Sequence, residues 1–211
     1  VFKTKPIGTT TTAERMRIDS SGNVGIGTPT PATLVDLAAE NPTLTLRDSR
    51  TGGTWTAGTA LGKLDFYTSD STGIGAHSIA SIGVVAGGVN TASPDGELVF
   101  ATGAYNAVSQ ERMRIDSSGN LLVGGTSPYA VDATTITQTG LVYSSRTSNL
   151  SGQFDRRTTD GEIMRFTKDG TDVGSIGNNG DNLGIESVDV GLLFLSGSSQ
   201  IVPTGGSFGV S

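Results

Sequence analysis

One segment of this sequence occurs twice. Residues 14–23 read ERMRIDSSGN, and they recur without a change as residues 111–120. The similarity continues downstream, where Val24, Ile26 and Gly27 correspond to Leu121, Val123 and Gly124. A repeat of this kind is typical of chains built from small supersecondary units, none of which buries its hydrophobic face alone. We expect the chain to begin inside one repeat and to end in a later, diverged one.

The repeated segment has the pattern of a β-hairpin. Met16 and Ile18 alternate with charged residues, which is the period of two of a half-buried strand. Residues 20–23 follow as a turn, where glycine adopts a positive φ at little cost. We therefore predict that Gly22 and Gly119 are turn residues. The residues predicted to pack inward are Met16, Ile18, Val24 and Ile26 in the first copy, and Met113, Ile115, Leu121 and Val123 in the second.

Further strands are predicted between and after the two copies. A glycine turn leading into an alternating strand recurs at 61–66, 95–100 and 160–166, and short β-branched runs bounded by turn residues occupy 43–46, 78–85 and 173–176. Residues 32–40 fit a short helix or a strand equally well. The predicted fold is all-β, with short antiparallel hairpin repeats. We divide it into a partial repeat at 1–40, a central module at 41–136 and a diverged repeat at 137–211.

The composition argues against a single compact globule. Hydrophobic residues make up 35% and charged residues 16% of a chain with 31 glycines, so material for both a core and ion pairs is scarce. Such strands can bury surface against copies of the same chain. The acidic pI of about 4.7 argues against nucleic-acid binding. The sequence has no apolar run long enough to insert in a membrane, and no cysteine for disulfides or thiolate metal sites.

Three segments carry a resemblance to a known family. The string ERMRIDSSGNVGIGT at 14–28, together with residues 55–85 and 160–177, is similar to the repeats of tail-fibre and related virion appendage proteins of tailed bacteriophages, many of them marine. The resemblance implies an elongated, intertwined homotrimeric fibre with β-prism or small β-sandwich modules. It also implies location in the virion, in the tail or another appendage, after assembly in the cytoplasm of a bacterial host.

The function implied is that of a structural shaft segment of a tail fibre that supports host attachment. Its partners would be two further copies of the chain and other virion tail proteins. A host cell-surface glycan or protein would be contacted through a distal tip that is not in this chain. We expect the chain to be cut from the middle of a longer protein, and a head fibre is the alternative position in the virion.

Candidate chemical sites are few, and we predict no catalytic residue, cofactor or metal site. His77 is the single histidine, and no nucleophile motif accompanies it. The glycines at 22–27 lack the spacing of a phosphate-binding loop. The Asp19 and Asp116 turns could hold calcium, but ordinary aspartate turns explain them more simply. Arg15, Arg17, Arg112 and Arg114 could bind anionic sugars, although neighbouring carboxylates would neutralise them.

Two rival functions remain. A polysaccharide-depolymerase tailspike would need two facing carboxylates, for which the acids on or beside strands are Asp65, Asp95, Glu97, Asp160 and Glu162. A fibre module that binds the receptor directly would use exposed aromatic rings, for which the candidates are Trp55, Tyr67, Tyr105 and Tyr129. A cleft with two unpaired carboxylates would favour the first function, and binding of the chain to host cells would favour the second.

Overall fold

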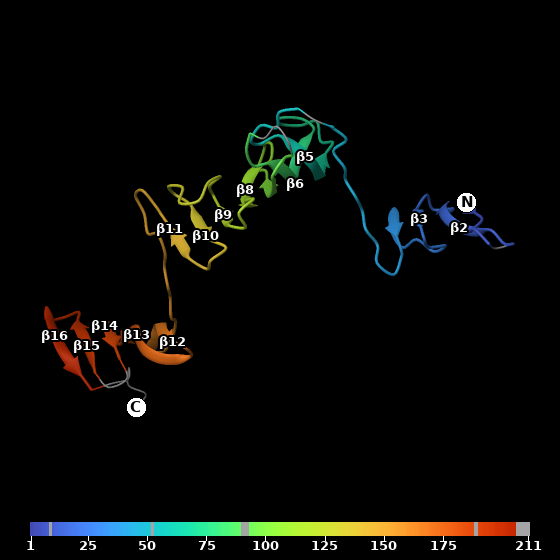
Figure 1. Ribbon diagram of the computed structural model, residues 1–211. Helices are drawn as coiled ribbons and strands as arrows, with labels where there is room; N and C mark the ends of the chain where they lie inside the picture. The colour runs from blue at the N-terminus through green and yellow to red at the C-terminus, as the bar shows by residue number, and fades with distance from the viewer. Residues whose placement is uncertain (9, 52, 90–92, 188–189, 206–211) are drawn as a thin grey trace. The chain divides into compact units, whose positions relative to one another are not determined.

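The computed structural model describes residues 1–8, 10–51, 53–89, 93–187 and 190–205. Within these ranges the regular elements are β-strands and there is no helix, which confirms the all-β prediction (Figure 1). The chain divides into two compact units, Val1–Gln110 and Glu111–Ser211. The repeat boundaries at 1–40, 41–136 and 137–211 stay a prediction, because units defined by contacts need not coincide with sequence repeats.

The first unit begins with a small sheet that contains the first repeat hairpin. Its strands follow the order β1 (Phe2–Thr4), β2 (Ala13–Ile18), β3 (Val24–Ile26) and β4 (Val35–Leu37). The β1–β2 and β2–β3 pairs are antiparallel, whereas β3 and β4 are parallel. The segment 32–40, which fits helix or strand in sequence, therefore forms a strand. Its parallel pairing departs from the purely antiparallel prediction, because the connection through residues 27–34 returns the chain to the same strand direction.

Three longer antiparallel strands follow in the first unit. The elements are β5 (Ala60–Thr68), β6 (His77–Ala86) and β7 (Gly96–Thr102), and β6 lies between the other two. β5 and β6 cover the strands predicted at 61–66 and 78–85, and β7 begins one residue after the start of the segment predicted at 95–100. The strand predicted at 43–46 is not formed. The apolar residues of this segment contact a strand instead of forming one, since the Leu46 side chain lies against the backbone of Gly62 in β5.

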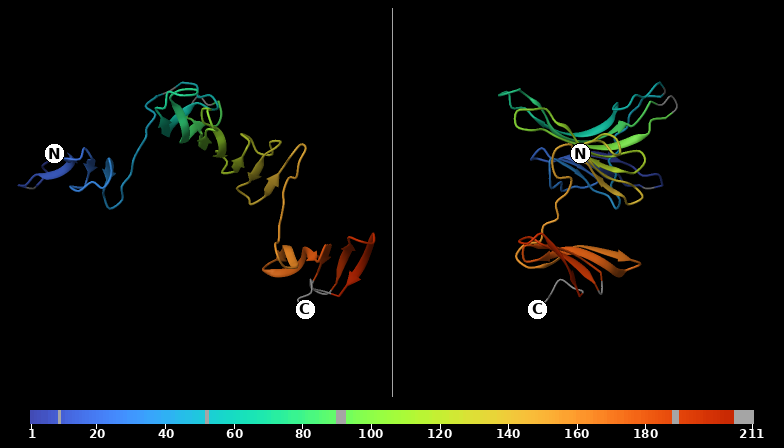
Figure 2. Two further views of the ribbon diagram at one scale, coloured as in Figure 1. Left: turned by 180° about the vertical axis from the view of Figure 1, so that it is seen from behind. Right: turned by 90° about the vertical axis from the view of Figure 1, so that its left-hand side faces the viewer.

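The second repeat hairpin opens the second unit. It consists of β8 (Gln110–Ile115) and β9 (Leu121–Val123), and the antiparallel strands β10 (Thr134–Ile136) and β11 (Val142–Ser144) follow. A separate antiparallel meander occupies the rest of the unit. Its strands are β12 (Gly161–Lys168), β13 (Thr171–Asn179), β14 (Asn182–Glu186), β15 (Gly191–Leu195) and β16 (Gln200–Thr204). Figure 2 shows these orange-to-red strands side by side.

Very little apolar surface is buried in the described part of the chain. The buried apolar side chains there are Trp55, Ala86, Leu122 and Ala133, and two of these are alanines. Trp55 has a charged neighbour, because the Arg50 guanidinium carbon lies 4.4 Å from the centre of its ring and Arg50 is ion-paired with Asp48. The sheets are thus held mainly by strand pairing, and most of their large apolar side chains remain exposed.

Candidate functional site

The clearest candidate surface is one face of β5, β6 and β7. Residues paired directly across strands lie on the same side of a sheet, and the register places Leu64 opposite Ile82, and Ile82 opposite Phe100. Two residues further along β6, Val84 lies opposite Leu98 of β7 on the same side of the sheet. Leu64 is 53% exposed and Ile82 is 41% exposed, although Ile82 lies on the central strand. We call this surface, made of Leu64, Phe66, Ile82, Val84, Leu98 and Phe100, the central apolar face.

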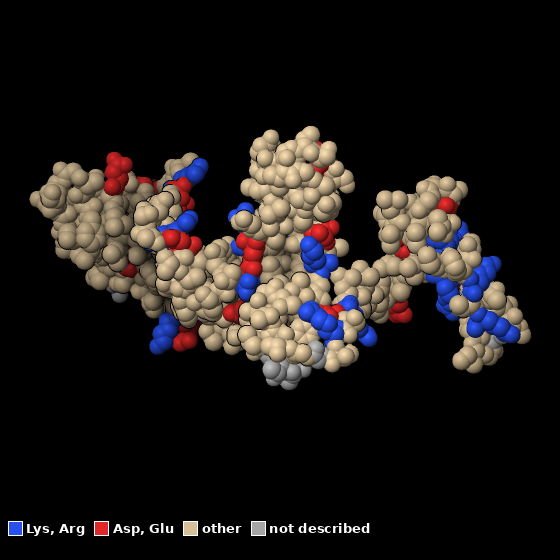
Figure 3. Space-filling view, turned by 90° about the horizontal axis from the view of Figure 1, so that it is seen from above, with Lys and Arg blue, Asp and Glu red and all other residues tan. Residues whose placement is uncertain are grey.

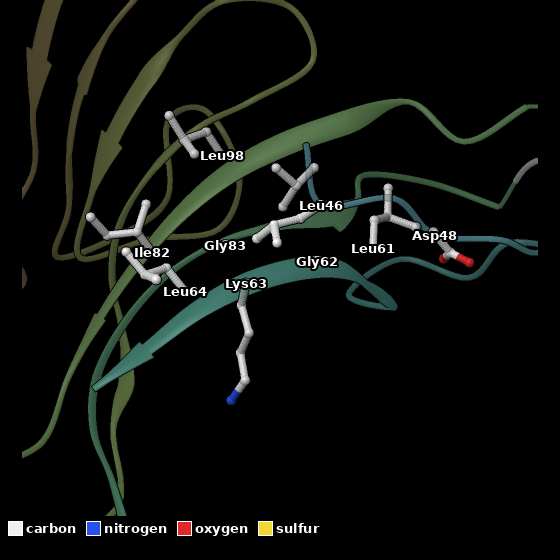
Figure 4. A pocket seen from close by; sticks show the side chains of 10 residues that line it. Leu46, Asp48, Leu61, Gly62, Lys63, Leu64, Ile82, Gly83 and Leu98 are labelled. Atoms are coloured by element: carbon white, nitrogen blue, oxygen red, sulfur yellow. The ribbon is translucent and has the colours of Figure 1, made fainter. Parts of the chain in front are cut away.

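A groove of about 360 Å³ lies on the central apolar face (Figure 4). Leu46, Leu64 and Ile82 lie along one side of the strands in this view, whereas Lys63 points away from them. The loop packs directly on β5 here, because a Cβ atom at Gly62 would lie in ordinary van der Waals contact with Cβ of Leu46, at 3.7 Å. The loop around Leu46 therefore covers one part of the face and leaves the remaining apolar side chains open.

The opposite side of β5 is polar and internally neutralised. Nζ of Lys63 lies 3.0 Å from Oδ2 of Asp65, and the Ser78 hydroxyl donates a hydrogen bond of 2.6 Å to Oδ1 of the same carboxylate. The Ser78 hydrogen bond, and secondarily Lys63, hold the pKa of Asp65 below its usual value. The β5 strand is thus amphipathic, with one polar face and one apolar face.

The two repeat hairpins share the same turn. In the first copy, Oδ1 of Asp19 accepts hydrogen bonds of 2.8 and 2.9 Å from the backbone N–H groups of Ser21 and Asn23. These backbone bonds, led by the one from Asn23, lower the pKa of Asp19. Gly22 has a φ of 86°, which favours glycine.

Asp116 makes the corresponding bonds in the second copy, at 3.0 Å from Ser118 and 2.8 Å from Asn120, and Gly119 has a φ of 84°. The carboxylate oxygens of both turns are therefore engaged by the turn itself. This geometry agrees with an ordinary aspartate turn.

The eight residues predicted to pack inward lie on one face of each hairpin. The cross-strand pairs are Met16 with Ile26, Ile18 with Val24, Met113 with Val123, and Ile115 with Leu121. This face is open within the chain: Ile18 is 58% exposed and Ile115 is 40% exposed. Packing of the face against other copies stays a prediction.

Sequence reasoning missed the face that is buried within the chain. Leu122 is fully buried, and its cross-strand neighbours are Arg114 and Thr135, which is also buried. In the first copy the position corresponding to Leu122 is Gly25, where a Cβ atom would come within 2.6 Å of the Thr28 carbonyl oxygen. The two copies differ here, with Gly25 in the first and Leu122 in the second. This difference was the sequence feature that could have indicated a buried face in the second hairpin.

The β12–β16 sheet also carries an apolar row. The register aligns Met164, Ile176, Ile185, Leu192 and Pro203 across all five strands. Ile185 is 45% exposed and Leu192 is 46% exposed. A hollow beside Val190 and Leu192 is open to the same side chains. Both units therefore present rows of exposed apolar residues.

The strand-borne acids considered for catalysis have partners in the structure. Asp65 binds Lys63 and Ser78 as described, and Oδ1 of Asp95 accepts a 3.1 Å bond from the N–H of Gly88. Asp160 accepts bonds of 2.8 Å from both Asn178 and Gly180, and Glu162 is ion-paired with Arg165. Glu97 is buried at the start of β7.

One arginine of each repeat lies close to a carboxylate of its own strand, whereas Nε of Arg15 donates a 3.0 Å hydrogen bond to the Thr4 hydroxyl. Arg17 is paired with Glu14, and Arg114 is paired with Glu111. The hydrogen bond from Arg17 lowers the pKa of Glu14. Figure 3 shows the same mixture more widely, with Lys and Arg beside Asp and Glu and large uncharged areas between them.

The remaining candidates are placed as follows. His77 begins β6, and its Nδ1–H donates to the Gly75 carbonyl. Trp55 is buried, whereas Tyr67, Tyr105 and Tyr129 are exposed, and Tyr129 stacks edge-to-face on Tyr143. The described residues contain no cluster of His, Asp and Glu side chains that could hold a metal ion. In the same ranges, no helix is long and apolar enough to cross a membrane.

Comparison with models of known protein families and with curated proteins finds no match to this chain.

Proposed function

We propose that this chain is a structural shaft segment of a homotrimeric bacteriophage tail fibre that supports host attachment. The observation that carries the proposal is the central apolar face, where Leu64, Phe66 and Ile82 stay exposed in an otherwise regular sheet. Large apolar patches on soluble proteins mark interaction surfaces. Burial of this face against copies of the same chain supplies the core that one chain lacks.

Repetition supports the same proposal. The two hairpins expose equivalent apolar residues, and the β12–β16 sheet adds another open row. Because the same kind of face recurs along the chain, three chains in register would bring like faces together at each repeat. The terminal strands β12 and β16 of the last sheet would also find backbone partners in neighbouring copies. The number three comes from the resemblance to phage fibres.

The proposal assigns a mechanical role and no enzymatic activity. The shaft would hold an adhesive tip away from the virion, and three tips on one shaft would add weak contacts through multivalency. The other partners are virion tail proteins, and assembly takes place in the bacterial cytoplasm before incorporation into the virion. The elongated, intertwined arrangement with β-prism or β-sandwich modules belongs to the same proposal.

Sedimentation equilibrium of the 211-residue chain tests the assembly. The expected species contains three chains of 21.5 kDa each. A folded monomer with stable, cooperative unfolding would contradict the proposal, because it would mean that the apolar faces need no cover. A density map of the virion that locates this chain would test its position. If the chain lies on the head and not on the tail, the protein is a head fibre.

A further inference from the structure

An asparagine directly followed by glycine occurs once in this sequence, at Asn179–Gly180. The pair lies where β13 turns into β14, and Asn179 pairs with Asn182 across the turn. Both residues of the pair are exposed. Gly180 has a φ of 58°, and a Cβ atom there would meet nothing within 4 Å. The turn is therefore open to water, and no side chain at Gly180 shields the backbone nitrogen that follows Asn179.

An asparagine in this position can react with the nitrogen of the next residue. The Gly180 nitrogen bonds to Cγ of Asn179 and closes a succinimide ring. This nitrogen loses its proton to solvent, and the side-chain NH₂ group takes up a proton and leaves as ammonia. Water then opens the ring. Cleavage between the nitrogen and Cγ gives aspartate, whereas cleavage between the nitrogen and the main-chain carbonyl carbon gives isoaspartate.

The structure holds the reacting nitrogen against a carboxylate. The N–H of Gly180 donates a 2.8 Å hydrogen bond to Oδ2 of Asp160, 20 positions earlier in the chain. Oδ1 of Asp160 accepts a 2.8 Å bond from Nδ2 of Asn178, which fixes the carboxylate beside the turn. The same Nδ2 group lies 3.3 Å from the carbonyl oxygen of Gly180. We call this arrangement of Asp160, Asn178 and Gly180 the Asp160 clamp.

The Asp160 clamp opposes ring closure. The Gly180 nitrogen must give up its proton, and a hydrogen bond to an ionised carboxylate is stronger than one between neutral groups. The main chain of Asn179 must also rotate until this nitrogen faces Cγ. The 3.0 Å bond from Nδ2 of Asn182 to the Asn179 carbonyl oxygen resists this rotation. Ring closure therefore requires the turn to open first.

We propose that Asn179 is a site of spontaneous deamidation and that Asp160 controls the rate of this modification. With the clamp closed, the pair reacts slowly. When the turn opens, the pair reacts at the rate of an unstructured peptide. Asp160 is a positioning residue, because it holds the Gly180 nitrogen and forms no bond in the reaction. The inference goes beyond the shaft role and does not rest on it.

Isoaspartate at this position would change the sheet. Its main chain runs through Cβ and Cγ, so the backbone becomes one atom longer at a turn in which Gly180 and Asp181 alone separate the paired residues. The same two strands pair Ile176 with Ile185 in the apolar row. The modification therefore weakens the alignment of this row, and the Asp160 clamp delays that loss.

The test follows deamidation of the full chain during prolonged incubation in mildly alkaline buffer. Peptide mapping by mass spectrometry measures conversion of the Asn179 amide to a carboxyl group, and enzymatic methylation measures isoaspartate. The same chain in denaturant gives the rate without the clamp. The folded rate is expected to be about tenfold or more lower, because only the locally opened fraction reacts. Asn23 and Asn120 serve as internal references, since the branched side chains of Val24 and Leu121 hinder attack.

Four variants decide the assignment. Asp160→Ala is expected to raise the folded rate about fivefold or more, the effect of losing one hydrogen bond to a charged group. Asn178→Ala, which frees the carboxylate, should raise it less. The matched control Asp155→Ala removes another exposed carboxylate, paired with Arg157 in the segment before β12, and should change the rate by less than about twofold. Asn179→Gln should abolish the signal, which assigns it to this residue.

Each outcome supports or overturns the proposal. Equal rates in the folded and denatured chain, a rate that falls in Asp160→Ala, or equal effects of Asp160→Ala and Asp155→Ala would overturn control by Asp160. Absence of conversion at Asn179 in denaturant would overturn the site itself.

Loss of the fold is recognised separately. General unfolding of Asp160→Ala would raise the rates at Asn23 and Asn120 as well, whereas opening of the clamp leaves them unchanged. If Asp160→Ala does not fold, Asn178→Ala gives the answer with Asp160 in place. A trimer whose deamidation ignores Asp160 would refute the clamp alone, and a folded monomer whose deamidation depends on Asp160 would refute the trimeric shaft alone.

Discussion

Substitution of Leu64 tests most directly whether the central apolar face is an interface. The side chain is 53% exposed, and full burial of a leucine contributes about 1.5–3 kcal/mol. Covering the exposed half would therefore contribute about 1 kcal/mol per copy and about 3 kcal/mol per trimer. Leu64→Ala should raise the dissociation constant of the trimer roughly a hundredfold. Leu64→Asp should prevent assembly, because a buried unpaired carboxylate costs several kcal/mol more in each copy.

Analytical ultracentrifugation over a range of protein concentrations measures this effect. The matched control is Lys63→Ala, which alters the neighbouring residue of the same strand on the side turned away from the face (Figure 4). The control should leave the dissociation constant within about threefold of the parent value, since exposed ion pairs contribute little. An intact Leu64→Asp trimer, or equal weakening by the control, would refute the reasoning.

Three further predictions concern the repeat hairpins. Ile18→Asp should abolish the trimer on a native gel whereas His77→Ala should leave it, and a trimer of the Ile18→Asp variant would show that this face is not packed. The lowered pKa of Asp19 means that its ionised form stabilises the turn above the ordinary aspartate value of 3.8, and that this stability is lost as pH falls through the lower folded pKa. The midpoint of the pH-dependent NMR shifts of the hairpin should therefore lie below 3.8, and a midpoint at or above 3.8 would argue against it. Gly22→Ala should lower stability by about 1 kcal/mol because of its φ of 86°, whereas Gly197→Ala, in open space and without a positive φ, should be neutral in thermal denaturation.

The hairpins were predictable because their information is local. The alternation of Met16 and Ile18, the aspartate and the glycine of the turn lie within a few residues of one another. The strand alternation and the turn residues favour the same local structure, which is a β-hairpin.

The departures come from contacts between distant residues. Leu122 is buried together with Thr135, its cross-strand neighbour on β10, and the alternation within β9 alone does not show that this face, and not the face of Met113, becomes buried. The alternation at 43–46 resembles a strand, but a strand exists only where backbone partners are present. The sequence also does not show that Asn106 bonds to Ile74, 32 positions earlier, or that Tyr105 stays exposed.

The scarcity of buried apolar residues within one chain has a consequence for its life in the cell. Between synthesis and assembly, the faces carrying Leu64 and Leu192 are open to proteases, chaperones and unrelated nascent chains. Survival then depends on how quickly sister polypeptides meet, so a cell that makes many copies in a short burst would lose fewer of them than one that makes the same number slowly.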